Sequence, residues 1–400
     1  MEYKTYKLGT CFSLIENGAI IKQRKEAKGF PITRIETLSH GKFNRDKLGH
    51  ADIFDTTPYK RYFLEDKDLI MSHINSRAFL GRTVLYRKKG NEQIIHGMNV
   101  LRIKTNEQFL DPVFASYLFK TSHFKKAIDS IRKDAINQSS INIFDICNIQ
   151  ISLPSITEQR KISHALQLID KKIETNHLIN DNLEAIAKQL YDYWFVQFDF
   201  PNEEGKPYKS SGGAMVWNDK LKREIPKEWM ASNYTDLFTI GNGQTMPQNE
   251  GLVPAYGGNG IVKMVEISNY PACIIIGRVG ANCGSIHYSK VPCWVSDNAI
   301  SICSKNDDWQ PFLFYSLKLY NLSKNKGGSS QPLITHEALK HLYFPMSEKH
   351  INQFCHIVNE LQDLIYSNQQ EILKLTKQRD ELLPLLMNGQ AMVNSDLSDD

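Results

Sequence analysis

Two long stretches of this chain place apolar residues at alternating spacings of four and three, which is the period of a coiled-coil helix. The first stripe covers residues 162–194, and the second covers residues 354–386, displaced by 192 positions. Asn176 of the first stripe coincides with Asn368 of the second. A single stripe usually indicates a helix packed on its own domain, but a duplicated one favours two helices that pack on each other. It also predicts two pseudo-repeats, each a globular block followed by a helix.

The sequence marks the ends of both predicted helices. Pro154 precedes a capping box formed by Ser155 and Glu158, and the first helix must end before Pro201. Gly389 is a natural C-terminal stop for the second helix.

Length and composition fit this division. A chain of 400 residues exceeds one ordinary core and suits two domains plus the helices, and its 41% apolar content is typical of globular proteins. We therefore expect an α+β fold with pseudo-twofold internal repetition and two long antiparallel helices. The expected segments are a globular block at 1–153, a helical rod at 154–200, a linker at 201–215, a globular block at 216–345, a rod at 346–390 and an acidic, disordered tail at 391–400.

Charge is distributed unevenly along the chain. Residues 1–150 contain 25 Lys and Arg against 16 Asp and Glu, a net charge of +9, whereas residues 201–345 reach only +2. The first block is basic enough to suggest a polyanionic partner. No run of 18 apolar residues predicts a membrane span, and the first residues lack the apolar core of a signal peptide. A cytoplasmic protein is expected.

Four of the seven cysteines, Cys273, Cys283, Cys293 and Cys303, recur every ten residues. A zinc site is one explanation of this spacing. Buried thiols on neighbouring strands are the favoured explanation, because no CxxC pair is present. We therefore expect no bound metal and a reduced protein.

Polar and glycine-rich turns follow strand-like runs in both globular blocks. Residues 69–75 resemble residues 274–280, and Asn99 matches Asn298. Residues 277–284 place one arginine and one asparagine among glycines, which let a backbone approach a ligand closely. Arginine can form two hydrogen bonds with guanine, and asparagine or glutamine can do so with adenine. Hairpin turns and solvated loops are the alternative explanation for each turn taken alone.

The chain shows no familiar catalytic motif. No GxxxxGK[ST] loop or HExxH pair occurs, and the stretch Asp111-Pro112-Val113-Phe114 resembles an amino-methyltransferase motif only superficially. These absences identify no catalytic residues in the sequence.

Five segments have distinctive sequences: LPSITEQRKI (153–162), NLEAIA (182–187), WFVQFDF (194–200), IPKEW (225–229) and LLPLLMNG (382–389). Together they resemble the specificity subunits of type I restriction–modification enzymes. The resemblance covers the whole chain at the level of organisation. It is most specific in the helical segments, since the globular blocks of that family vary with the DNA they read. It departs from the family at 347–350, where the usual Pro-x-x-Glu-Gln start of the second helix is degraded.

The resemblance implies two target-recognition domains, each reading one half of a bipartite site in double-stranded DNA, and two rods that set the distance between the halves. It also implies two modification (methyltransferase) subunits docked on the rods, with restriction subunits joining them. The resemblance implies that S-adenosylmethionine, ATP and magnesium bind to those partners, and that this chain is non-catalytic, has no catalytic residues and binds no cofactor. One alternative is a self-contained DNA methyltransferase, which would bind S-adenosylmethionine itself. Another is a coiled-coil scaffold without salt-dependent affinity for DNA.

The turns and loops supply the candidate DNA contacts. Base or groove contacts are expected in the first block from His73, Asn75, Arg82, Gln138 and Ser139. In the second block they are expected from Tyr256, Arg278, Asn282, Ser330 and Gln331. Phosphate contacts are expected from Arg87, Lys88, Lys89, Lys324 and Lys326, for which a solvated run of charge is the alternative.

The duplicated stripes also predict how the helices pair and where partners dock. Antiparallel pairing places Leu166 opposite Leu382, and Asn180 opposite Asn368, where two amides can satisfy each other. A two-helix rod cannot bury every apolar face, and the aromatic end of the first rod would form a large exposed patch. Modification subunits are therefore expected to contact Arg160, Lys171, Tyr191, Tyr193, Trp194, Phe195, Phe198 and Phe200.

Overall fold

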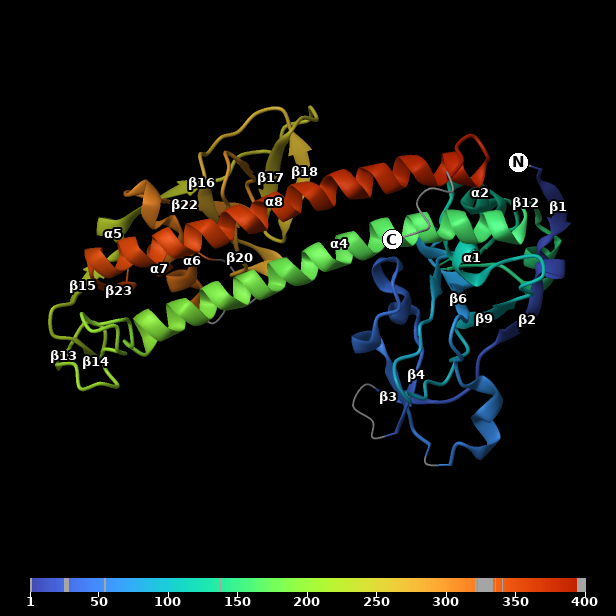
Figure 1. The fold of residues 1–400 in the computed structure, drawn as a ribbon, viewed down its shortest axis with the longest axis horizontal. Coiled ribbons are helices and arrows are strands. Elements are labelled where there is room, and N and C mark those ends of the chain that lie inside the picture. Colours follow the sequence, from blue (N-terminus) through green and yellow to red (C-terminus); the bar gives the residue numbers. More distant parts are fainter. Residues whose placement is uncertain are drawn as a thin grey trace. The chain divides into compact units, whose positions relative to one another are not determined.

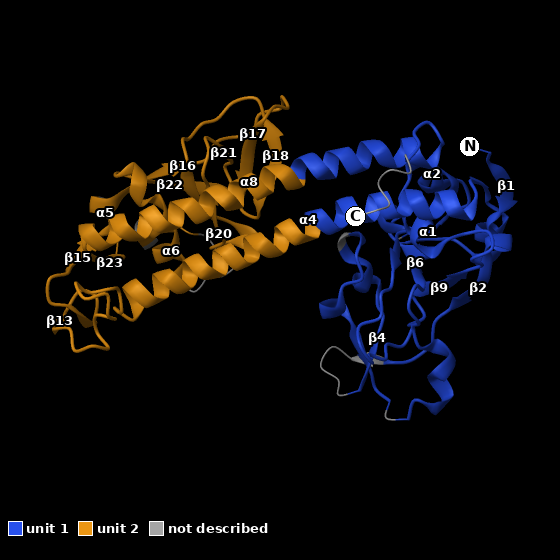
Figure 2. Ribbon diagram, in the orientation of Figure 1, with its two compact units in different colours: residues 1–173, 373–400 blue, residues 174–372 orange. Residues whose placement is uncertain are grey.

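The computed structural model describes residues 2–24, 29–53, 55–136, 138–320, 322, 334, 336–339 and 341–393. The chain forms two compact units (Figure 2). Unit 1 comprises residues 1–173 and 373–400, and unit 2 comprises residues 174–372. The two long helices, α4 (Ile156–Tyr191) and α8 (Glu348–Met387), each contribute residues to both units. The predicted acidic tail lies outside the described residues from position 394 onward.

A four-stranded antiparallel sheet lies at the centre of unit 1 (Figure 1). Its order is β2 (Phe12–Asn17), β9 (Val100–Thr105), β6 (Leu69–Ser72) and β8 (Thr83–Leu85). All four residues of β6 are buried, as expected for an interior strand. Smaller sheets are β1 (Lys4–Lys7) with β12 (Gln150–Leu153); β10 (Lys133–Asp134), β11 (Ser139–Ser140) and β7 (Ile74–Asn75); and β3 (Gln23–Arg24), β5 (Gly49–Ala51) and β4 (Phe30–Ile32).

The short helices of unit 1 begin at side-chain caps. Asp111 starts α1 (Pro112–Leu118) because its carboxylate accepts the backbone N–H groups of Val113 at 3.0 Å and Phe114 at 2.9 Å. Pro112 has no backbone N–H group, and its position in the first turn requires none, because the N–H groups there have no partner within the helix. Residues 111–114, which superficially resemble an amino-methyltransferase motif, therefore form the start of α1. Thr121 and Asn142 cap α2 (Ser122–Ser130) and α3 (Ile143–Asn148) in the same way.

A second four-stranded antiparallel sheet lies in unit 2, in the order β16 (Phe238–Asn242), β22 (Ala299–Ser304), β19 (Cys273–Gly277) and β20 (Ile286–Ser289). A three-stranded sheet contains β18 (Gly260–Val265), β17 (Val253–Gly257) and β21 (Trp294–Val295), of which β17 and β21 run parallel. Two antiparallel pairs complete the unit: β13 (Met215–Asn218) with β14 (Arg223–Pro226), and β15 (Met230–Asn233) with β23 (Tyr343–Met346).

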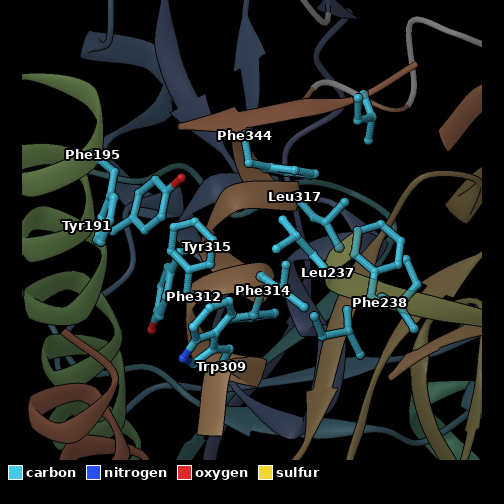
Figure 3. Close-up of a cluster of buried hydrophobic side chains, with 14 of the residues drawn as sticks. Tyr191, Phe195, Leu237, Phe238, Trp309, Phe312, Phe314, Tyr315, Leu317 and Phe344 are labelled. Carbon is cyan, nitrogen blue, oxygen red and sulfur yellow. The ribbon is translucent and has the colours of Figure 1, made fainter. Parts of the chain in front are cut away.

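The core of unit 2 is strongly aromatic. Helix α6 (Gln310–Leu319) is buried from Gln310 to Leu317, while α5 (Tyr234–Leu237) and α7 (His336–Leu339) are single turns. A π-helical turn (Asp192–Val196) follows α4 and directs Phe195 into this core. Figure 3 shows Tyr191 and Phe195 beside Phe312 and Tyr315 of α6. The Phe195 ring centroid lies 4.9 Å from that of Phe312 and 5.3 Å from that of Phe354.

The predicted ends of the long helices agree with local geometry. The backbone N–H of Glu158 donates to the hydroxyl of Ser155 at 3.3 Å, the first half of the expected capping box. The Glu158 carboxylate accepts a hydrogen bond from Lys161, also at 3.3 Å. Helix α8 ends at Met387, and Gly389 follows with a φ of +71°, in the left-handed region that favours glycine.

Side-chain hydrogen bonds join α4 and α8 within unit 2. The Asn368 amide nitrogen donates to the Asn180 amide oxygen at 2.9 Å, and the Asn176 amide donates to the Glu371 carboxylate at 2.8 Å. Residue numbers rise in α4 as they fall in α8, so the two segments run antiparallel in this unit. The predicted contact between Asn180 and Asn368 is confirmed.

Within unit 1, Arg379 of α8 donates to the carboxylate of Asp170 of α4 at 2.9 Å. Tyr117 of α1 donates to the same carboxylate at 2.6 Å. Leu166 is buried, whereas Leu382, which was expected to lie opposite it, is 37% exposed. The expected pairing of these two leucines stays a prediction.

Candidate nucleic-acid interface

In unit 1, the turn between β6 and β8 is held by backbone hydrogen bonds. The N–H of Ser72 donates to the carbonyl of Arg82 at 2.9 Å, and the N–H of Gly81 donates to the carbonyl of Ser72 at 2.8 Å. Just past β6, the carbonyl of His73 accepts from the N–H of Ile141 at 3.0 Å. These hydrogen bonds fix the backbone of the turn that contains the candidates His73, Asn75 and Arg82.

In unit 2, the turn between β19 and β20 has the same bonds. The N–H of Gly277 donates to the carbonyl of Ser285 at 2.9 Å, and the N–H of Gly284 donates to the carbonyl of Gly277 at 2.8 Å. The carbonyl of Arg278 accepts from the N–H of Ile334 at 3.1 Å. Residues from distant parts of the sequence therefore close this turn as well.

The matching bonds make the two turns comparable residue by residue. His73 corresponds to Arg278, and Arg82 corresponds to Ser285. The first of these matches agrees with the similarity between residues 69–75 and 274–280. Both turns also lie at the same end of sheets that have equivalent strand orders.

A cleft of about 580 Å³ lies beside the turn of unit 1. The Arg82 guanidinium carbon lies 4.3 Å from the centroid of the Phe79 ring, and its Nη1 donates to the carbonyl of Leu38 at 3.4 Å. The Asn75 amide donates to the Ser72 hydroxyl at 3.1 Å. The structure therefore brings the candidates Asn75 and Arg82 together. The cleft is lined by Arg34, Ile35, Glu36, Leu38, Ser39, Lys47, Ser72, Asn75, Phe79, Arg82 and Asn99.

The other three base-contact candidates of unit 1 do not line this cleft. His73 is buried, and desolvation lowers its pKa to about 4, so the imidazole is neutral at pH 7. Ser139 is buried, and its hydroxyl donates to Asp134 at 2.6 Å. Gln138 is exposed. Protein thus covers the side chains of His73 and Ser139, contrary to the exposure that the prediction assumed.

The cationic run Arg87, Lys88 and Lys89 is exposed, as a phosphate-binding loop requires. Carboxylates accompany it, however. Arg87 lies 3.7 Å from Asp66, whose carboxylate also accepts the N–H of Lys88 at 3.0 Å. The N–H of Lys89 donates to Glu92 at 2.8 Å. These contacts offset part of the positive charge, and phosphate binding here stays a prediction.

In unit 2, glycines let several turns approach one another. A Cβ on Gly258 would lie 3.6 Å from the carbonyl oxygen of Asn298 and 4.0 Å from the Cβ of Asn282. Arg278 is half-buried and Asn282 is exposed, whereas Tyr256 is buried, which raises its pKa to about 12. Arg278 and Asn282 are therefore the accessible candidates in this group. The candidates Lys324, Lys326, Ser330 and Gln331 lie outside the described residues.

Sequence reasoning missed Arg34, Lys47 and Phe79, which line the cleft of unit 1. Their segments are separate in sequence, and no spacing rule links the first two to the turn after β6. The match of Asn99 with Asn298 was the one available signal for this part of the cleft.

The aromatic residues expected to contact partners belong to the core of unit 2. Tyr191, Trp194, Phe195, Phe198 and Phe200 are all buried in one cluster (Figure 3 shows Tyr191 and Phe195). The premise that these five side chains form an exposed patch is wrong, because β-strands and α6 of unit 2 cover them.

Three candidates for partner contact remain exposed on or beside α4: Arg160, Lys171 and Tyr193. Arg160 lies 3.9 Å from the carboxylates of Asp111 and Glu107. The exposed apolar surface lies elsewhere on the long helices, at Leu168, Leu178, Ile179, Ile186, Ile357, Leu364, Leu373, Leu382 and Leu385.

The evenly spaced cysteines are divided between two clusters. Cys273 and Cys293 are buried with sulfur atoms 3.6 Å apart, and Cys303 packs beside them, whereas Cys283 belongs to the aromatic core. Among the described residues, no group of three or more His, Cys, Asp or Glu side chains is arranged to hold a metal ion. Within the same residues, no helix combines the length and apolarity needed to cross a membrane.

Comparison with known proteins identifies the family. A family model described as "Type I restriction modification DNA specificity domain" matches residues 1–185 and 226–382. The chain is 27% identical over 415 residues to a putative type I restriction enzyme MjaX specificity subunit of Methanocaldococcus jannaschii, covering 98% of this chain and 95% of that protein. It is 26% identical over 204 residues to the HindI specificity subunit of Haemophilus influenzae, covering 50% of this chain and 42% of that subunit.

The fold agrees with this assignment. The crystal structure of the type I restriction–modification S subunit from M. genitalium matches with a TM-score of 0.60 at 18% identity, covering 96% of both chains. The protein therefore belongs to the type I restriction–modification DNA specificity family, and it is a DNA specificity subunit.

Proposed function

We propose that this specificity subunit reads a bipartite site in double-stranded DNA, with one half read by unit 1 and the other by unit 2. The observation that carries the proposal is the matching pair of turns after β6 and β19. Each turn is held by the same backbone hydrogen bonds and lies beside an arginine, Arg82 or Arg278. A guanidinium on a rigid turn suits recognition of base edges.

The proposal includes an internal repeat. The two recognition domains are residues 1–153 and 216–345, joined by the rods 154–200 and 346–390, with a linker at 201–215 and an acidic tail at 391–400. The equivalent strand orders of the two four-stranded sheets support this repeat. The contact between Asn180 and Asn368 supports a coiled-coil pairing of α4 and α8, in which polar seam residues select one register.

An exchange of recognition segments tests the bipartite reading. Residues 216–345 are replaced by the corresponding residues of a relative with another specificity. The hybrid is produced with its modification subunits, and methylated sites are mapped by sequencing. One half of the methylated motif should change while the other half is retained. A change in both halves would overturn the two-reader proposal.

We further propose that two modification subunits dock on the exposed apolar faces of α4 and α8, and that restriction subunits join them. Leu178 is 59% exposed, and Ile186 lies two turns further along the same helix. A Leu178→Glu or Ile186→Glu variant should reduce copurification with the modification subunit. The matched variant Gln189→Glu adds the same charge at an exposed polar position and should not. Equal copurification of all three variants would contradict this docking site.

The chemistry in this proposal belongs to the partners. They would use S-adenosylmethionine to methylate DNA, and ATP with magnesium during cleavage, while this chain selects the site. A self-contained methyltransferase would instead bind S-adenosylmethionine without partners, which calorimetry on the purified chain can detect. A scaffold without a DNA role would show no salt-dependent affinity in fluorescence anisotropy with duplex DNA.

A further inference from the structure

We propose that Arg82 is the side chain through which unit 1 reads a guanine, and that Phe79 is the positioning residue that holds its guanidinium. This inference rests on the proposed reading of DNA by unit 1. It assigns the unit a specific base-reading residue and a specific base.

The surroundings of Arg82 suit a ligand rich in hydrogen-bond acceptors. The cleft is lined by the cations Arg34, Lys47 and Arg82 and by the amides of Asn75 and Asn99. Arg34 lies 3.6 Å from Glu36, its neighbour in the cleft. No carboxylate among the described residues is within ion-pairing distance of Arg82. Its charge is thus available to a ligand.

The guanidinium of Arg82 is held before any ligand arrives. Its Nη1 donates to the Leu38 carbonyl at 3.4 Å, and its guanidinium carbon lies 4.3 Å from the Phe79 ring centroid. Cation–π contact of this kind favours a guanidinium held beside the ring. The Nε and Nη2 groups make no hydrogen bond with the described residues, so one edge of the planar fork remains available for two parallel hydrogen bonds. Guanine presents O6 and N7 in that arrangement in the major groove.

In unit 1, the position that corresponds to Arg278 of unit 2 carries no accessible cation. His73 occupies the position that corresponds to Arg278 of unit 2, but it is buried. Arg82 occupies the position of Ser285. At these two corresponding positions each unit therefore has one arginine, which is the residue after the first strand in unit 2 and the residue before the second strand in unit 1. Phe79, which lines the cleft, is 43% exposed.

A guanine edge and a DNA phosphate are both acceptors, and substitution can tell them apart. Arg82→Lys keeps the charge but loses the planar fork. Arg82→Ala removes both. Phe79→Leu keeps an apolar side chain but loses the aromatic face. Arg77→Ala is the matched control, because Arg77 lies on the same turn, is exposed and is not part of the cleft lining.

The full chain is produced with its modification subunits, and methylated sites are mapped in cellular DNA. For Arg82→Ala and Arg82→Lys, we expect discrimination at one guanine of the half-site read by unit 1 to fall by about 10-fold to 100-fold, with the other half-site unchanged. Phe79→Leu should relax the same base position by a smaller factor. Arg77→Ala should retain the complete motif. A merely structural role for Phe79 would instead lower methylation of all sites equally.

Two results would overturn the inference. One is an unchanged motif in Arg82→Ala. The other is an equal loss of affinity for all DNA sequences, with a slope of log affinity against log salt concentration that falls by about one, and with affinity recovered in Arg82→Lys. That result would assign Arg82 to a phosphate. An exchange of residues 1–153 distinguishes a failure of the Arg82 assignment from a failure of the proposed function. If that exchange alters a half-site while Arg82→Ala does not, only the assignment of Arg82 fails. If the exchange alters neither half-site, the proposed function fails.

Discussion

The hydrogen bond between Asn180 and Asn368 can be measured with a double-mutant cycle. Asn180 is 7% exposed and accepts from the Asn368 amide at 2.9 Å, while Asn368 is half-buried. A hydrogen bond of this kind contributes about 0.5–1.5 kcal/mol net. Water can reach the remaining amide when one partner is removed, so we expect a coupling free energy near the middle of that range, about 1 kcal/mol.

The cycle needs Asn180→Ala, Asn368→Ala and the double variant. Each Asn→Ala change also raises helix propensity, by up to about 0.7 kcal/mol. The cycle cancels this additive contribution, and the exposed residue Asn182, changed to Ala, measures it on the same helix.

Urea unfolding followed by tryptophan fluorescence is the appropriate assay. The signal reports on unit 2 alone, because unit 2 contains all five tryptophans of the chain. If the two single changes add to give the double change within about 0.3 kcal/mol, the amides do not interact and the antiparallel register argued for unit 2 is refuted. The tryptophans are Trp194, Trp217, Trp229, Trp294 and Trp309.

Three further predictions concern buried groups. Phe195→Ala should lower the free energy of unfolding of unit 2 by about 3–5 kcal/mol, because Phe195 is fully buried; a loss below about 1 kcal/mol in the fluorescence assay would contradict its core role. Arg102→Met should destabilise unit 1 by about 3–5 kcal/mol, since it leaves the buried Asp68 carboxylate without its partner at 2.7 Å; hydrogen exchange of the backbone amides of β9 measures this, and unchanged exchange would refute it. Burial lowers the pKa of His96 to about 4, so the unfolded chain takes up a proton near pH 6.5 that the folded chain binds only near pH 4. The stability of unit 1 should therefore fall by about 3 kcal/mol from this group as the pH drops from 6.5 to 4, and His96→Gln should lose that part of the pH dependence.

Local sequence determined much of the helical framework. The stripe of apolar residues, the Ser155 cap and Gly389 define long helices whose observed ends are Ile156 for α4 and Met387 for α8. The position of Asn180 relative to Asn368 predicted a contact that the structure contains. These features follow from helix periodicity and from hydrogen bonding within a few residues, which depend little on the rest of the chain.

Tertiary structure alone decided which side chains are covered. The aromatic end of α4 has the composition of a docking patch, and its burial depends on α6, more than 100 residues away in sequence. The cleft of unit 1 likewise combines Arg34, Lys47 and Arg82 from separate segments. Periodicity specifies which face of a helix is apolar, and a polar turn specifies which groups are present. Whether water, protein or DNA meets them depends on contacts between elements that are distant in sequence, and no local pattern records those contacts.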